Sequence, residues 1–286
     1  MNTLIMSIPK GFSLFGLQIN FYGLISALSY LLGILLTVKN AKKRGFKTED
    51  IVTLACYVIP AAIIGARLYY VLFRLDHYTN FWDFFKIWEG GLGFYGGLIG
   101  GAIAVMLYCI IHKKNFLALL DIIAPSLICA QALGRWGNFF NQEAYGYYND
   151  NPSTQWFPFS VYIDHCSQVD CTCPGFGWHL ATFFYESFGN FLTFAVLMLF
   201  LYKCDFKQNG IIACFYLILY GIERMLIEGL RTDSLYLGSI RISQLLSAIF
   251  VIAGIGLLLY ALHLNRKKKQ DDNSFSKIMK ILKTDL

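Results

Sequence analysis

Long, uninterrupted runs of apolar residues dominate the pattern of this chain. A helix needs roughly 20 apolar residues to cross the hydrocarbon core of a bilayer. Seven runs approach that length, at residues 18–38, 51–73, 95–111, 117–133, 178–202, 210–227 and 240–262. The runs are continuous and do not alternate with polar residues, so they predict helices and not the strands of a membrane barrel. We therefore expect an all-α polytopic membrane protein with about seven transmembrane helices.

Composition supports this class. Of the 286 residues, 56% are hydrophobic and 15% are charged, and the mean hydropathy is +0.51. A soluble domain carries about 25% charged residues, so the apolar excess must face lipid. Residues 1–16 hold a single lysine and no long apolar core. We therefore expect no cleavable signal peptide.

The basic residues predict how the helices are oriented. Sixteen of the 24 Lys and Arg residues fall in four segments that seven spans place on one side, at residues 39–47, 113–114, 203–207 and 266–283. Basic loops favour the cytoplasmic side, which puts the N-terminus outside and the C-terminus in the cytoplasm. The net charge of +6 follows this sidedness, so we expect no nucleic-acid partner.

We expect one transmembrane domain over residues 1–264, with an outer loop at about 147–177. Residues 265–286 should form a basic, frayed cytoplasmic tail. Cys166, Cys171 and Cys173 lie in the outer loop and fit either one disulfide with a thiol left over or free thiols. Their C-x4-C-x-C spacing matches no common zinc site, so no metal is expected.

A glycine-rich segment spans residues 89–101, where seven of thirteen residues are glycine. Glycine lets two helices approach closely, and it also permits irregular backbone along a cavity. Both interpretations remain open from the sequence.

Two polar segments lie at the predicted outer boundary. Residues 134–146 read GRWGNFFNQEAYG, in which Arg135 and Glu143 are either an ion pair or part of an anion site. The second segment, residues 223–233, places Arg224, Glu228 and Arg231 on one face if it continues as helix. Its arginines could pair with Glu228 or clamp a phosphate.

Arginines, glycines and aromatic residues on one side suit the headgroup of an anionic lipid. A transporter of an anionic or lipid-like substrate is the main alternative, and a structural or sensory seven-helix protein is a third. No motif among these residues names a reaction.

The segment at 134–146 resembles the G-R-x-G-N-F-x-N-x-E-x-x-G pattern of the prolipoprotein diacylglyceryl transferase family. Further similar segments, in the same order, are GAR at 65–67, WEGG at 88–91, GGLIG at 96–100, RTD at 231–233 and SQLLS at 243–247. Two departures stand out. Tyr95 occupies a position where some members have histidine, and the HLATFFYE stretch at 179–186 lacks the family's proline and is one residue longer.

The resemblance implies transfer of a diacylglyceryl group from phosphatidylglycerol to the lipobox cysteine of a prolipoprotein, with release of glycerol phosphate. It implies a multi-pass protein of the bacterial inner membrane, acting at the outer leaflet in lipoprotein biosynthesis. No cofactor is expected, since the lipid's own phosphate leaves.

The resemblance also implies roles for single residues. Arg135 and Arg231 would bind the phosphate, Asn138 would orient the headgroup or Glu143, and Glu143 would hold Arg135 or act as base, the first being favoured. Tyr22 and Tyr95 are candidates for hydroxyl contacts or a proton relay. Gly146, through its backbone, and Arg67 would complete the phosphatidylglycerol site.

Overall fold

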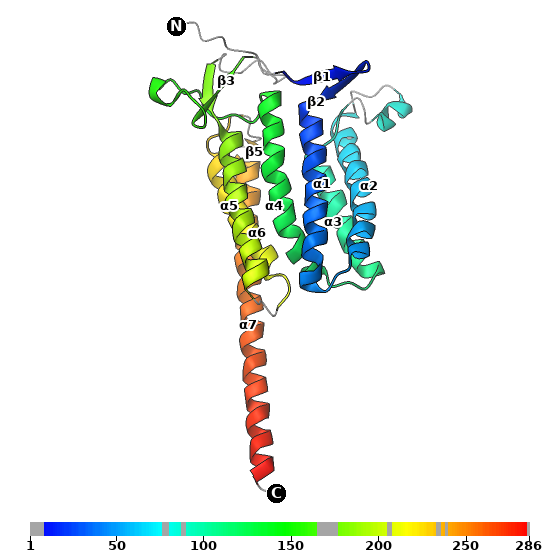
Figure 1. Cartoon of the computed structure of the whole chain (residues 1–286), viewed down its shortest axis with the longest axis vertical. Helices are drawn as coiled ribbons and strands as arrows, with labels where there is room; N and C mark the ends of the chain where they lie inside the picture. Colours follow the sequence, from blue (N-terminus) through cyan, green and yellow to red (C-terminus); the bar gives the residue numbers. More distant parts are fainter. Residues whose placement is uncertain are drawn as a thin grey trace. The chain divides into compact units, whose positions relative to one another are not determined.

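The computed structural model describes residues 9–75, 80–86, 90–164, 177–204, 208–232, 236–237 and 240–284. Within these ranges the chain forms seven α-helices (Figure 1). They are α1 Phe21–Ala41, α2 Thr48–Phe73, α3 Phe94–Ile111, α4 Phe116–Asn141, α5 Thr182–Lys203, α6 Ile211–Glu228 and α7 Ile242–Thr284. The number of helices agrees with the seven apolar runs.

Five of the described helices are long and apolar enough to cross a bilayer, namely α1, α2, α4, α5 and α7. α3 is apolar but shorter, and α6 contains Glu223, Arg224 and Glu228 near its end. The chain is therefore mostly helical, as an all-α membrane protein should be.

Three short antiparallel hairpins add to this helical fold. They are β1 Gly11–Leu14 with β2 Leu17–Asn20, β3 Ser160–Ile163 with β4 Gly177–Leu180, and β5 Tyr236–Leu237 with β6 Ile240–Arg241. Three predicted helix starts need correction as a result: residues 18–20, 178–180 and 240–241 are strand. Apolarity alone does not distinguish a buried strand from a helix end.

Two predicted helix ends also need correction. α4 continues eight residues past the predicted end at 133, because Arg135 and Asn138 interrupt the apolar run without interrupting the helix. α7 continues through the basic tail to Thr284, where we expected a frayed segment. Residues 265–284 contain neither Gly nor Pro, so the sequence offers no strong helix breaker there.

The helices divide into two compact units. One comprises the chain up to Gly33 and from Ile123 onward, and the other comprises Ile34–Ile122. Each unit is described by itself.

In the Ile34–Ile122 unit, glycines let α2 and α3 pack backbone to backbone. A Cβ added to Gly96 would lie 2.2 Å from the carbonyl oxygen of Gly65, and one added to Gly65 would lie 2.4 Å from that of Gly96. One turn further, a Cβ on Gly100 would lie 2.3 Å from the carbonyl oxygen of Ala61. Helix packing thus explains the helical half of the glycine-rich segment.

The same unit contains two ionic contacts near the start of α2 and the start of α4. Arg44 pairs with the fully buried Asp121 at 2.9 Å. Lys114 pairs with Asp50 at 2.7 Å, and the Tyr108 hydroxyl donates to the Asp50 carbonyl at 2.9 Å. These contacts fix the α1–α2 and α3–α4 connections to the helices.

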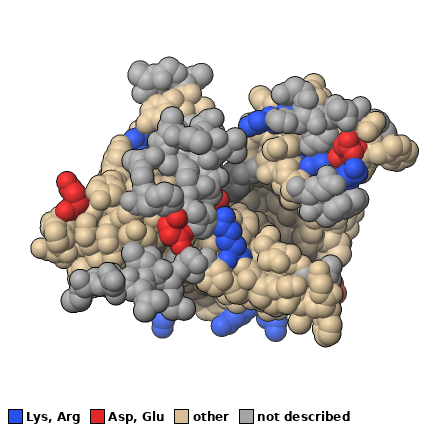
Figure 2. All heavy atoms as spheres, turned by 90° about the horizontal axis from the view of Figure 1, so that it is seen from above, with Lys and Arg blue, Asp and Glu red and all other residues tan. Residues whose placement is uncertain are grey.

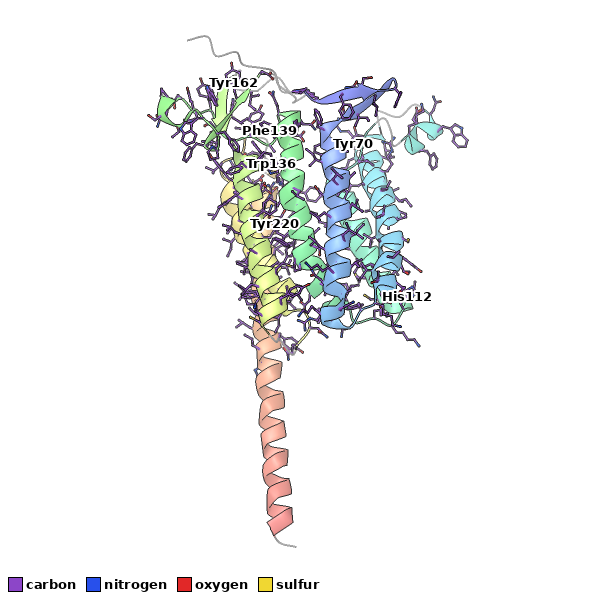
Figure 3. All side chains as sticks on the ribbon, viewed as in Figure 1. Tyr70, His112, Trp136, Phe139, Tyr162 and Tyr220 are labelled. Atoms are coloured by element: carbon purple, nitrogen blue, oxygen red, sulfur yellow. The ribbon has the colours of Figure 1, made fainter. Side chains whose placement is uncertain are left out.

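In the other unit, α5 packs on α6 and α6 on α7, and the β3–β4 hairpin lies at the end of α4 (Figure 1). Trp136 and Phe139 lie near the end of α4 (Figure 3), and their rings pack on that of Phe183 of α5 with centroid distances of 5.7 and 5.2 Å. A buried cluster continues from there into the hairpin and comprises Tyr145, Val161, Ile163, Ala181 and Phe183. This packing fixes the position of the polar segment at the end of α4.

Alanine substitutions in α3 test the glycine contact. We expect Gly96→Ala to lower the free energy of unfolding by about 1–3 kcal/mol, because its Cβ would overlap the Gly65 carbonyl. Gly101→Ala is the matched control, since its Cβ would meet its nearest neighbour at an ordinary 3.8 Å. Thermal unfolding in detergent measures both. Equal melting temperatures for the two variants would contradict the packing argument.

Candidate functional site

The polar segment 134–146 begins as the last turns of α4 and then folds back on itself. Gln142 and Ala144 have positive φ angles of 50° and 56°, which end the helix after Asn141. The turn returns Glu143 toward the helix, where its backbone N–H donates to the Asn138 carbonyl at 3.0 Å. Asn138 Nδ2 then donates to Glu143 Oε1 at 2.8 Å, as expected for an Asn that orients this carboxylate.

Gly146 follows in an extended segment where no side chain fits. A Cβ there would lie 2.8 Å from the Leu180 Cβ and 2.9 Å from the Leu230 carbonyl oxygen. Its N–H donates to the Leu180 carbonyl at 2.9 Å, and it forms a bridge with Arg231. The backbone at Gly146 thus ties the end of the α4 segment to β4 and to the residues after α6.

His179 supports this junction from β4. The residue is fully buried, and its Nδ1 donates to the Gly146 carbonyl oxygen at 3.0 Å. Tyr145 and Tyr148 pack on its ring with centroid distances of 4.7 and 5.6 Å. The side chain is therefore a buried structural contact, next to the polar segment.

Glu186 lies at the centre of the charged residues, and we did not select it from the sequence. Its carboxylate is 2% exposed and accepts ion pairs from three arginines. The distances are 2.5 Å to Arg135, 2.8 Å to Arg224 and 3.8 Å to Arg231. The sequence did contain a signal for this residue: Glu186 is a carboxylate within an otherwise apolar span, and such a residue needs a partner.

One expected pairing needs correction. The ion pair of Arg135 is made with Glu186, and not with Glu143 as we favoured. Glu143 accepts instead from the amides of Asn138 and Asn141. The ion-pair partner of Arg135 is therefore a buried carboxylate on α5, and not the carboxylate that is closer in sequence.

Arg224 links the cluster to α6. It contacts Glu186 through one nitrogen and Glu228, four residues on, through the other at 2.7 Å. This confirms the expected pairing within the helix. Arg231 is not on that helical face, because α6 ends at Glu228, yet it still reaches Glu186 at 3.8 Å.

Arg241 is a further cation that the sequence argument did not include. Its guanidinium donates to the Glu228 carbonyl, and to the hydroxyls of Tyr236 and Tyr147 at 2.9 Å each. The hydrogen bond to Tyr236, followed by that to Tyr147, raises the pKa of Arg241 above its ordinary value. Its positive charge is thus present throughout the physiological range.

Three arginines share two buried carboxylates in these ion pairs. Arg135, Arg224 and Arg231 contact Glu186, and Arg224 also contacts Glu228. The three arginine side chains are 21%, 14% and 11% exposed. Viewed from the end on which β1–β4 lie, little of the described surface is charged (Figure 2). A mostly buried positive cluster is suited to binding a single anion.

Tyr22 belongs to the same unit and lies beside the polar turn. A Cβ on Gly137 would lie 2.8 Å from the Tyr22 ring, so the glycine lets α1 and α4 approach. Tyr22 is also near enough to Glu143 and Arg135 for both charges to act on its hydroxyl. The structure thus brings Tyr22, Arg135, Asn138, Glu143, Gly146 and Arg231 together.

Arg67 and Tyr95 lie in the other unit. Arg67 is buried, and its guanidinium donates at 2.7–3.1 Å to four backbone carbonyls, of Asp83, Phe84, Gly90 and Gly91. Tyr95 lies in the first turn of α3, with its ring 6.3 Å from that of Tyr69. Arg67 therefore shapes the segment that leads into α3.

Asp83 in that segment is held by Lys86, at 2.7 Å. The hydrogen bond from Lys86 lowers the pKa of Asp83 below its ordinary value. Over the described ranges no group of three or more His, Cys, Asp or Glu is placed to hold a metal ion. Cys166, Cys171, Cys173 and Asp233 lie outside the described residues.

The fold and the site define a mostly helical protein of the membrane class with a buried cluster of arginines around Glu186. The sequence profile of prolipoprotein diacylglyceryl transferases matches residues 9–260, and the chain belongs to this family.

Relatives of similar length support the family assignment. A phosphatidylglycerol–prolipoprotein diacylglyceryl transferase of Clostridium perfringens is 40% identical over 92% of this chain and 97% of its own. Proteins with the same activity in their names are 42% identical in Streptococcus pneumoniae, over 91% of this chain and 95% of theirs, and 43% identical in Finegoldia magna, over 85% and 92%.

The central position of Glu186 predicts a large stability effect. We expect Glu186→Gln to lower the free energy of unfolding by about 3–5 kcal/mol, because it leaves three arginines partly buried without their shared carboxylate. Glu143→Gln is the matched control, since amides and not arginines contact that carboxylate. Thermal unfolding of both variants in detergent provides the comparison. Similar losses would show that Glu186 is not the centre of the cluster.

Proposed function

We propose that this protein transfers the diacylglyceryl group of phosphatidylglycerol to the lipobox cysteine of a prolipoprotein. The reaction forms a thioether and releases glycerol phosphate, as the first step of lipoprotein maturation. One observation carries the proposal beyond family membership: the guanidinium groups of Arg135, Arg224 and Arg231 converge on the buried carboxylate of Glu186. That arrangement suits a lipid phosphate.

In the reaction, the cysteine thiol loses its proton and the thiolate attacks the glyceryl carbon that bears the phosphate ester. The new bond is carbon to sulfur, and the bond from that carbon to the phosphate oxygen breaks. The electron pair stays with the phosphate, which changes from a diester to a monoester. Negative charge therefore increases on the leaving group as the reaction proceeds.

The arginines are suited to stabilise this increase in negative charge on the phosphate. Arg135 and Arg224 are held by Glu186 before any ligand arrives, so their positions need little reorganisation in the transition state. Arg231, at 3.8 Å from Glu186, is the most loosely paired of the three in this contact. We assign the phosphate to the edge formed by these guanidinium groups.

The polar turn after α4 supplies the neighbouring groups. Asn138 holds Glu143, and both Tyr22 and Arg135 are close to this pair. We propose that Asn138 and Glu143 position the headgroup, and that the Tyr22 hydroxyl takes part in moving the thiol proton. Tyr95 remains a second candidate for that relay.

Gly146 acts through its backbone, as its close contacts require. For Arg67 we propose an indirect role: it shapes the segment before α3, since four carbonyls already accept from its guanidinium.

We further propose the location. The protein would be a multi-pass component of the bacterial inner membrane, with the arginine cluster toward the outer leaflet. The four basic segments support this orientation, with the N-terminus outside and the tail in the cytoplasm. Residues 1–264 would form the catalytic domain and residues 265–286 the cytoplasmic tail.

A direct assay tests the activity. Purified protein is incubated with phosphatidylglycerol and a peptide that contains a lipobox cysteine, and the peptide is analysed by mass spectrometry. We expect the mass of a diacylglyceryl thioether. Flux of an anionic substrate across liposomes, without any thioether, would favour the transporter alternative.

Arg135→Lys tests the use of the guanidinium fork in the same assay. The lysine keeps the charge but loses the planar pair of donors, and we expect the transfer rate to fall about 100-fold. Arg266→Lys, in the tail, makes the same change of residue type away from the cluster and should leave the rate unaltered. Near-normal transfer by Arg135→Lys would refute fork binding of the phosphate.

A further inference from the structure

The interface of α5 and α6 contains polar groups that lack partners. Asn190 of α5 is fully buried, and neither polar atom of its amide has a hydrogen-bond partner in the described part of the chain. Both carboxyl oxygens of Glu223 on α6 are also buried and have no side-chain hydrogen-bond partner there, while the backbone N–H of Asn190 acts on this carboxyl. Buried polar groups are nearly always hydrogen-bonded, so these two side chains call for an explanation.

The two side chains are neighbours across this interface. A Cβ added to Gly189 would lie 2.5 Å from Glu223 Oε1 and 3.1 Å from Oε2. The carboxyl therefore lies against the backbone of α5 at the residue before Asn190. Glycine at 189 is what makes room for it.

The pair also borders the arginine cluster. Asn190 comes four residues after Glu186 on α5, which places both on one helical face about 6 Å apart along the axis. Glu223 directly precedes Arg224, and the charges of Glu186, Arg135 and Arg224 all act on its carboxyl. A ligand bound by the arginines would lie next to Asn190 and Glu223.

The chemistry of the two groups indicates a hydroxyl ligand. Carboxylate oxygens need hydrogen-bond donors, while the amide both donates and accepts. A hydroxyl group supplies both functions. Among the polar groups of phosphatidylglycerol, only the headgroup hydroxyls donate, because the ester carbonyls and the ionised phosphate accept.

We propose that Asn190 and Glu223 bind the hydroxyls of the phosphatidylglycerol headgroup and select this lipid over other anionic phosphodiesters. This assignment rests on the proposed function. The three-carbon headgroup is of a length comparable with the step from Glu186 to Asn190. A site built to bond a hydroxyl rejects an analogue without one, since its own polar groups then stay unpaired.

Two lipid donors with the same acyl chains test the assignment: phosphatidylglycerol and phosphatidylpropanol, whose three-carbon headgroup has no hydroxyl. We expect thioether formation by the unsubstituted protein to favour phosphatidylglycerol by about tenfold or more. Asn190→Leu and Glu223→Leu should bring the ratio of the two rates close to one. Glu223→Gln, which can still bond a hydroxyl, should restore most of the preference.

Thr193→Val is the matched control, because it removes a buried hydroxyl three residues further along α5, away from Glu186. Its donor ratio should equal that of the unsubstituted protein. Melting temperatures verify that each variant is folded, and alanine replaces leucine in any variant that is not. An unchanged donor ratio in both folded variants, or equal losses on both donors, would overturn the assignment.

Failure of the proposed function is a separate outcome. It would appear as no thioether from either lipid with the unsubstituted protein. The hydroxyl site is then judged by binding: phosphatidylglycerol should raise the melting temperature more than phosphatidylpropanol does, and Asn190→Leu should remove that difference. Equal stabilisation by both lipids would overturn the hydroxyl site as well.

Discussion

The ion pairs of Glu186 determine how the polar end of the bundle is built. One buried carboxylate on α5 receives Arg135 from α4, Arg224 from α6 and Arg231 from the segment after α6. Removing so many charges from water is costly unless they are paired with good geometry. Each of these backbone segments must therefore place its arginine at the two carboxylate oxygens of Glu186. The positions of the other site residues follow from the positions of these segments.

The pairing also prepares the site for an anion. A single unpaired arginine in an apolar bundle would be costly to bury, whereas arginines that share a buried carboxylate keep both their charge and their arrangement. The phosphate of a lipid then adds to an existing network and does not have to assemble one. Since charge grows on the leaving phosphate during transfer, donors that are already in place stabilise the transition state more than the ground state.

Much of the fold follows from the sequence, and the errors have physical causes. Continuous apolar runs identify all seven helices, but the run in α4 stops at Leu133 because Arg135 and Asn138 are polar, although their helix continues to Asn141. The polar segment 134–146 was placed wholly after this span, whereas its first eight residues are the end of α4. Glu186 was missed as a site residue. A lone carboxylate in a span is expected to have partners, but the sequence does not identify them. Distances along the chain favoured Glu143 as the partner of Arg135, while packing between helices supplied Glu186.

Arg67 and Arg135 show why an arginine near a membrane boundary does not by itself identify a phosphate site. From the sequence, both were assigned to the phosphatidylglycerol site, with Arg135 as a ligand of the phosphate. Arg67 donates to four backbone carbonyls, which fix the shape of a segment and take up most of the N–H donors of its guanidinium group. Arg135 shares one carboxylate with two other arginines. The ratio of acceptors to guanidinium groups around each residue, which only the folded chain establishes, separates a structural arginine from one that can bind phosphate.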